Sequence, residues 1–188
     1  ANTTNASMKT NNGLYKNNTS SNNCITHKHI TEGCAESPFQ AYRAAPDNFN
    51  PGSEHLFSSP IDIQPITFGG NGSAWFRFNT FKKGTTNSWN IETYWLGKDW
   101  LFVNNIAFNI DGKITNSPST NNNREIVHSV GVSERQFSPA PQELITSLTQ
   151  AQTVIVRLSG QNYYLEKQLT AQEVTNIKWY INFIKEGK

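Results

Sequence analysis

Apolar and polar residues alternate along the middle of the chain, and this alternation restricts the fold more than any other feature. In residues 74–81, Phe76 and Phe78 fall on one face of an extended strand, and more polar residues fall on the other. Residues 89–96 repeat the pattern, and residues 100–110 predict a third strand. A period of two residues is typical of strands that bury one face. The region therefore predicts a sheet with one face in the core.

Short turn sequences separate these strands and predict hairpin connections. Asp111-Gly112 is the strongest of them, because this dipeptide favours the left-handed backbone of a two-residue hairpin. Residues 116–123 are polar and predict a loop. Further strands are expected at residues 125–130, 132–137, 153–158 and 163–167.

Two helices complete the pattern. Residues 142–150 have apolar side chains at helical spacing. A capping box formed by Thr170 and Glu173 predicts the start of a C-terminal helix. Its inner face would carry Val174, Ile177, Ile181 and Ile184. The predicted class is α+β, an antiparallel β-sheet or sandwich with one internal helix and a C-terminal helix.

The sequence divides into an arm and one domain. Residues 1–23 contain almost no apolar side chains, so they are expected to form a flexible N-terminal tether. Residues 24–188 are expected to form a single α+β domain. Within it, residues 24–60 are predicted to be irregular and residues 61–188 to be the β-rich body with both helices. A short helix is predicted at residues 37–45, where Pro38 suits the first helical position.

The charge balance excludes several classes of partner. The net charge is +2, and only 16% of the 188 residues are charged, against about 25% in an average protein. Nucleic-acid-binding proteins usually concentrate basic residues on one face, so no nucleic-acid partner is expected. Binding driven by anionic lipid is not expected for the same reason. No apolar run approaches the roughly 20 residues of a membrane span.

Cys24 and Cys34 are the only cysteines, and in an extracellular protein such a pair usually forms a disulfide. The alternative is a zinc site that adds His27 and His29 to the two thiolates. These two histidines are closer in sequence than zinc sites usually place them. The disulfide is therefore the preferred interpretation, and no metal or cofactor is predicted.

Catalytic chemistry has no motif in this sequence. Nucleophile-elbow, zinc-protease and phosphate-loop patterns are absent. Glu92, Glu125 and Glu134 could form a pair of acids for glycoside hydrolysis only if folding brought two of them together. The protein is therefore expected not to be an enzyme. A cell-wall or glycan-acting enzyme is one alternative, and a periplasmic structural or inhibitor module is another.

Aromatic residues make up 12% of the chain and indicate binding. Trp and Tyr, together with Arg, dominate the hot spots of protein interfaces. Four aromatic residues on the strands and the last helix are expected in the core, namely Trp95, Phe102, Phe108 and Trp179. The segment before the strands is different, because loops carry function more often than the framework does. The predicted partner-binding residues are Tyr42, Arg43, Phe49 and Phe57.

Turn and strand patterns within residues 74–186 resemble those of small surface and periplasmic lipoproteins of Gram-negative bacteria. They lie at residues 97–102, 110–113, 156–160 and 169–170. The N-terminal arm is similar to the tether that follows a lipidated cysteine in this family, which includes factor H-binding lipoproteins.

The resemblance implies that the protein is secreted or anchored at the outer-membrane surface. A lipid anchor, outside this chain, would then be the only membrane association. It also implies a host serum protein as partner, with complement factor H as the candidate, recruited for immune evasion. No binding residue of the family can be placed at a position of this sequence.

Overall fold

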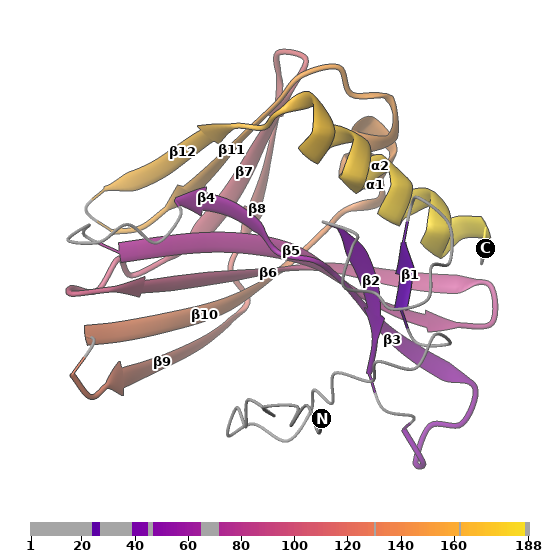
Figure 1. Ribbon diagram of the computed structural model, residues 1–188, viewed down its shortest axis with the longest axis horizontal. Helices are drawn as coiled ribbons and strands as arrows, with labels where there is room; N and C mark the ends of the chain where they lie inside the picture. The colour runs from indigo at the N-terminus through magenta and orange to yellow at the C-terminus, as the bar shows by residue number, and fades with distance from the viewer. Residues whose placement is uncertain are drawn as a thin grey trace, which may run out of the picture.

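The computed structural model describes residues 39–44, 47–64, 72–129, 131–161 and 163–186, together with the backbone of residues 24–26. These residues form two antiparallel β-sheets and two α-helices (Figure 1). The predicted α+β class, with one internal and one C-terminal helix, is confirmed. The tether predicted at residues 1–23 lies outside the described residues.

The larger sheet has the strand order β1-β2-β3-β5-β6-β10-β9, and β4 pairs with β5 on the same side as β3. Its strands are β1 (Cys24–Thr26), β2 (Gln40–Arg43), β3 (Ser53–Ser58), β4 (Ile61–Gln64), β5 (Gly72–Lys83), β6 (Thr86–Gly97), β9 (Asn121–Val127) and β10 (Gly131–Pro139). The smaller sheet has the order β12-β11-β7-β8. Its strands are β7 (Asn105–Ile110), β8 (Lys113–Pro118), β11 (Val154–Ser159) and β12 (Tyr164–Gln168). The helices are α1 (Gln142–Gln150) and α2 (Ala171–Glu186).

Two hairpins set the register of the sheets. β5 and β6 pair without a break from Gly72 opposite Gly97 to Lys83 opposite Thr86. β7 and β8 are joined by the predicted Asp111-Gly112 turn, in which both residues have positive φ, 50° and 91°. Two positive φ angles match the twist of the flanking strands, as in the turn type that this dipeptide favours.

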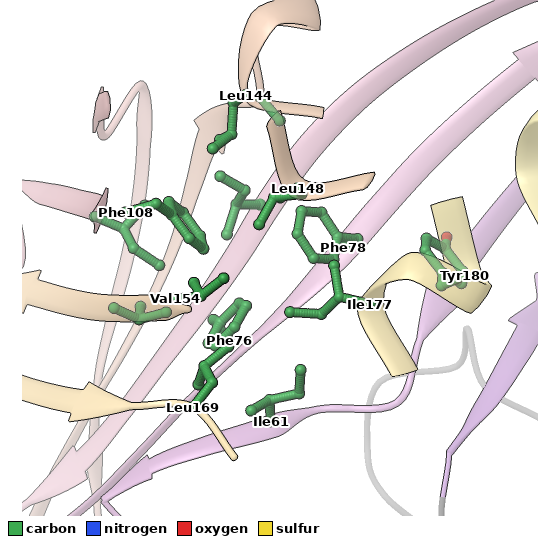
Figure 2. Close-up of a cluster of buried hydrophobic side chains, with 14 of the residues drawn as sticks. Ile61, Phe76, Phe78, Phe108, Leu144, Leu148, Val154, Leu169, Ile177 and Tyr180 are labelled. Carbon is green, nitrogen blue, oxygen red and sulfur yellow. The ribbon is translucent and has the colours of Figure 1, made fainter. Parts of the chain in front are cut away.

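Both helices and the smaller sheet lie on one side of the larger sheet (Figure 1). Phe76 of β5 packs against Phe108 of β7 with 5.7 Å between ring centroids, and Phe78 packs against Tyr180 of α2 at 6.3 Å. Figure 2 shows these rings converging with Leu148 of α1. Except for Phe57 and Val132, the buried hydrophobic side chains of the described residues form one cluster. We call this side of the larger sheet the inner face and the opposite side the outer face.

The C-terminal helix begins as the sequence predicts. The Glu173 carboxylate accepts a hydrogen bond from the Thr170 N–H at 2.9 Å, and the Thr170 hydroxyl accepts one from the Glu173 N–H at 3.2 Å. These two bonds satisfy N–H groups that have no partner within the helix. The predicted inner residues Val174, Ile177, Ile181 and Ile184 are all buried.

A buried carboxylate holds the loop that leads from the larger sheet to the smaller one. Glu134 of β10 is on the inner face, and its side chain is 0% exposed. It accepts hydrogen bonds from the N–H groups of Leu101, Phe102 and Val103 at 2.6, 2.7 and 3.0 Å. The Nε atom of Arg124 lies 3.2 Å from the same carboxylate. The predicted strand at residues 100–110 therefore begins only at Asn105.

The interpretation of residues 24–60 as irregular is wrong, because three strands of the larger sheet lie there, β1 to β3. The helix predicted at residues 37–45 is also wrong, since Gln40–Arg43 is strand β2. Ala41 of this strand pairs with Ser58 of β3. A local helix-start signal is weak beside the hydrogen bonds and burial that a sheet provides.

Two more expectations were wrong in detail. The polar stretch at residues 116–123 is not a loop, because β8 continues to Pro118 and β9 begins at Asn121. Phe102 is not in the core, since it is 37% exposed and has a positive φ of 54° in the loop held by Glu134. Trp95 and Phe108 are buried as predicted, and Trp179 is half-buried against the core.

Candidate interaction surface

The outer face of the larger sheet brings together two rows of large side chains from three neighbouring strands. Trp75 of β5, Tyr94 of β6 and Arg135 of β10 are register partners and form the first row. Arg77, Glu92 and Phe137 form the second row across the same strands. Register partners point to the same side of a sheet, so all six face away from the core.

The first row is a platform of stacked rings. Trp75 and Tyr94 lie 5.2 Å apart between ring centroids, with an angle of 19° between their planes. The guanidinium carbon of Arg135 lies 5.9 Å from the centre of the Tyr94 ring, and that of Arg77 lies 5.5 Å from Trp75. Arginine over an aromatic face is attracted by the ring quadrupole.

The second row contains a carboxylate enclosed by two arginines. Glu92 has only 1% of its side chain exposed, although it is on the outer face. Its two oxygens lie 2.7 Å from Arg77 Nε and 3.4 Å from Arg135 Nε. Two guanidinium groups and one carboxylate leave one positive charge here. The side chain of Arg135 remains 34% exposed, so part of this charge reaches the solvent.

Towards β3 the outer face continues as a second aromatic group. His55 is stacked on Phe81 with 3.8 Å between ring centroids, and it lies 4.1 Å from Phe57. Its Nε2 atom makes a hydrogen bond to Oδ1 of Asn79. Burial lowers the pKa of His55 below its usual value, against the opposing effect of the Asn79 hydrogen bond. Phe81 remains 48% exposed at the rim of this group.

The structure separates the four predicted partner-binding residues. Tyr42 and Phe57 are register partners on the outer face, where Tyr42 is 36% exposed and Phe57 is buried. Arg43 points to the other face and forms an ion pair with Glu54 at 3.3 Å. Phe49 is fully exposed in the turn between β2 and β3. Phe57 borders the second row, where the guanidinium carbon of Arg77 lies 4.7 Å from its ring centre, and Tyr42 lies next to Phe57. Arg43 and Phe49 have no such position.

The three glutamates considered for catalysis do not form an acid pair. Glu92 is on the outer face of β6, and Glu134 is on the inner face of β10. The Glu134 carboxylate is already occupied by three main-chain N–H groups. Glu125 is on the outer side of β9, where it pairs with Ser133 of β10. Glu92 pairs with Phe137, which is four residues further along β10, so the two carboxylates are well separated. Glycoside hydrolysis needs two carboxyl groups that flank one bond.

Small-molecule and metal sites have little support in the described part of the chain. A surface hollow of about 170 Å³ lies beside α1, between Lys113 and Gln150. Ligand pockets usually have about 300–1,000 Å³. The described residues contain no group of three or more His, Cys, Asp or Glu side chains suited to a metal ion. None of the described helices has the length and apolar character needed to cross a membrane.

The cysteine prediction falls largely outside the described residues. Cys24 is in β1, of which the backbone alone is described, and Cys34, His27 and His29 lie outside. The disulfide and the zinc alternative both stay predictions. No protein-family model, curated protein or solved structure matches this chain.

Proposed function

We propose that this protein is a binding protein that engages another protein through the outer face of its larger sheet. The observation that carries the proposal is the two rows on β5, β6 and β10. There Trp75 stacks on Tyr94 while Arg77 and Arg135 flank the rings. Trp, Tyr and Arg are the residues most enriched among interface hot spots.

The face has the chemistry to recognise an acidic partner. Arg135 makes an ion pair to Glu92 at 3.4 Å, and among the described residues its guanidinium group donates no hydrogen bond. A guanidinium group has five N–H donors, and a carboxylate can accept two of them in parallel. A partner carboxylate at Arg135, beside the Tyr94 ring, would use these donors. The Trp75 and Tyr94 rings would supply apolar contact with little loss of side-chain entropy.

The resemblance to Gram-negative surface lipoproteins supports the biological setting of the proposal. In this setting the protein is displayed at the outer membrane by a lipid anchor, or secreted, and recruits a host serum protein for immune evasion. Complement factor H is the partner to test first. The enzyme alternative stays a prediction, and two of its three candidate acids, Glu92 and Glu134, lie on opposite faces of the sheet.

A pair of matched double variants tests the proposal. Tyr94→Ala with Arg135→Ala removes an aromatic–arginine pair from the outer face. Arg157→Ala with Tyr164→Ala removes a similar pair from the smaller sheet, where the guanidinium carbon lies 4.3 Å from the ring centre. Immobilised wild-type protein is incubated with serum, the retained protein is identified, and binding of purified factor H is measured by surface plasmon resonance.

The expected result is one retained serum protein, whose affinity falls about tenfold or more in the outer-face variant and stays unchanged in the control. Thermal melting of both variants checks that they are folded. Equal losses in the two variants would show that the outer face is not the contact surface. If wild-type protein retains nothing from serum and does not bind factor H, recruitment of a host serum protein is wrong.

A further inference from the structure

The described strands leave one long sheet edge uncovered. The edges of the smaller sheet lie against the larger one, since Lys167 of β12 donates to the Asp62 carbonyl of β4 at 2.7 Å. On the opposite edge Ser117 of β8 donates to the Pro139 carbonyl of β10. At one end of the larger sheet, β1 has only three residues. At the other end, β9 has seven residues and forms the border of the sheet among the described strands (Figure 1).

β9 pairs with β10 along its whole length and, among the described strands, with nothing on its far side. The first six residues of β9 are exposed. They include a large apolar side chain, Ile126, which is 72% exposed. A strand in this position presents a row of unpaired N–H and C=O groups, which is a template for another strand. The Asn123 amide does not cover that row, because it donates instead to the Glu125 carboxylate two residues along at 3.0 Å.

Among the described residues, β9 has few of the usual means of protecting an edge, and Glu125 is its one charged side chain on the outer side. Proteins block edges with proline, bulges, lysine or charges that point across the edge. The sequence from Asn121 to Val127 has no proline, glycine or lysine. Its one basic residue, Arg124, is held on the inner side, where it contacts Glu134 at 3.2 Å and lies 5.2 Å from the Phe102 ring.

We propose that an extended segment of the protein partner adds to β9 as a further strand of the larger sheet. This inference rests on the proposed function and names how the partner is held. The partner's backbone would pair with β9, which gives affinity, and its alternate side chains would give specificity. On one side they would lie beside Asn121 and Asn123, next to the row that ends at Arg135. On the other side they would meet the exposed Ile126.

A second copy of this chain is a poorer occupant of the edge. Two β9 strands that pair antiparallel about their centre would place Arg124 opposite Arg124. Like charges directly opposite one another destabilise a strand pair. A partner segment has no such constraint, and an acidic residue on its outward side would reach Arg135. The preferred ligand is therefore an extended, partly acidic segment of about six residues with an apolar side chain for Ile126.

Proline substitution separates backbone pairing from side-chain contact. Successive N–H groups of a strand point to alternate edges of that strand. One of the two variants Asn122→Pro and Asn123→Pro therefore removes a hydrogen bond to β10, and the other removes a donor on the free edge. The variant that keeps the wild-type melting temperature is the informative one. Asn122→Ala and Asn123→Ala are the matched controls, because they shorten the same side chains and keep both N–H groups.

The measurements use the full chain with purified factor H and with any other protein that it retains from serum. The tolerated proline variant should bind at least about tenfold more weakly, and the alanine controls should bind as wild type does. Hydrogen exchange of residues 121–127 should slow when the partner is bound. The edge proposal would be overturned if the proline variant binds with wild-type affinity and the hydrogen exchange of residues 121–127 does not change on binding. This holds even if the Tyr94 and Arg135 double variant confirms the outer face.

Other outcomes are equally decisive. A concentration-dependent dimer that the tolerated proline variant abolishes would assign the edge to a second copy and overturn the partner strand. Retention of no serum protein by the wild-type chain would overturn both the edge proposal and the proposed function. Should both proline variants unfold, the exchange measurement on the wild-type complex decides alone.

Discussion

Two buried glutamates on neighbouring strands show how differently the two faces of the larger sheet are held together. Glu134 on β10 points to the inner face, and Glu92 on β6 points to the outer face. Their side chains are 0% and 1% exposed. Glu134 accepts hydrogen bonds from three consecutive main-chain N–H groups, whereas Glu92 is matched by two arginine side chains.

The difference separates residues that build the fold from residues that remain available for binding. Main-chain donors cannot turn away, so a change at Glu134 leaves them buried without a partner, at about 1–3 kcal/mol for each group. The arginines around Glu92 have long side chains that can turn to water. The outer face can therefore change its contacts when a partner arrives, and the inner face cannot.

The largest effect is expected when Glu134 is removed. Glu134→Ala should lower the free energy of unfolding by about 3–5 kcal/mol, because three N–H groups and Arg124 lose one buried acceptor. Denaturation in guanidinium chloride measures the change. Glu134→Gln retains an acceptor oxygen and should be destabilised less. A loss below about 1 kcal/mol for the alanine variant would mean that the loop finds other partners and that the contrast between the two faces is wrong.

Two adjacent residues of β5 give a second contrast between the faces. Phe76 is fully buried on the inner face, and Trp75 is half-buried on the outer face. Phe76→Ala should destabilise the protein by about 2 kcal/mol more than Trp75→Ala, although tryptophan is the larger side chain. The free energies of unfolding of the two variants, measured under the same conditions, give the difference. Equal values would indicate that the Trp75 ring belongs to the core.

Much of the fold can be predicted from the sequence because its signals are local. The alternation around Phe76 and Phe78 places the correct face of β5 in the core, and the Asp111-Gly112 dipeptide marks the hairpin. The Thr170 and Glu173 capping box marks the start of α2. Each signal acts within a few residues of the chain.

The interaction surface could not be predicted in this way, because it depends on register between distant segments. Trp75, Tyr94 and Arg135 become neighbours only when β5, β6 and β10 pair. The alternation in the sequence does place Trp75 on the face of β5 that points away from the core. This is the one feature of the local sequence that points to the surface. Alternation predicts Phe102 in the core, but three hydrogen bonds to Glu134 fix its loop in another conformation.

A change at Glu92 should have an intermediate effect. Glu92→Gln preserves the shape of the side chain but removes the charge that Arg77 and Arg135 share. We expect a loss of about 1–2 kcal/mol in the free energy of unfolding, since both arginines can reach solvent. The same guanidinium denaturation experiment measures it. A loss as large as that of Glu134→Ala would place Glu92 among the residues that build the fold.

The smallest effect concerns His55, and it depends on pH. The pKa of His55 is lowered from 6.5, first because the ring is buried, and also because of the charge on Arg77; Asn79 and Glu92 oppose this shift. As the pH falls below about 6.5, the unfolded chain therefore takes up the proton before the folded protein does. Stability should be unaffected by His55 above this pH, should fall as the pH is lowered through it, and should stop falling below the lowered pKa.

Comparison of wild type with His55→Gln isolates this contribution. The free energy of unfolding is measured by urea denaturation at about pH 7.5 and about pH 5.5, where His55 changes charge in the unfolded chain. Asp111 and Glu143 have lowered pKa values, from hydrogen bonds to the Thr153 and Gln152 main chain and to Lys113, so they titrate below this range. The other histidines are the same in both proteins and cancel in the difference. Wild type should lose more stability than the variant between the two pH values. A larger loss in the variant would mean that the folded protein stabilises charged His55, which would make the aromatic group around Phe81 a cation site of the outer face.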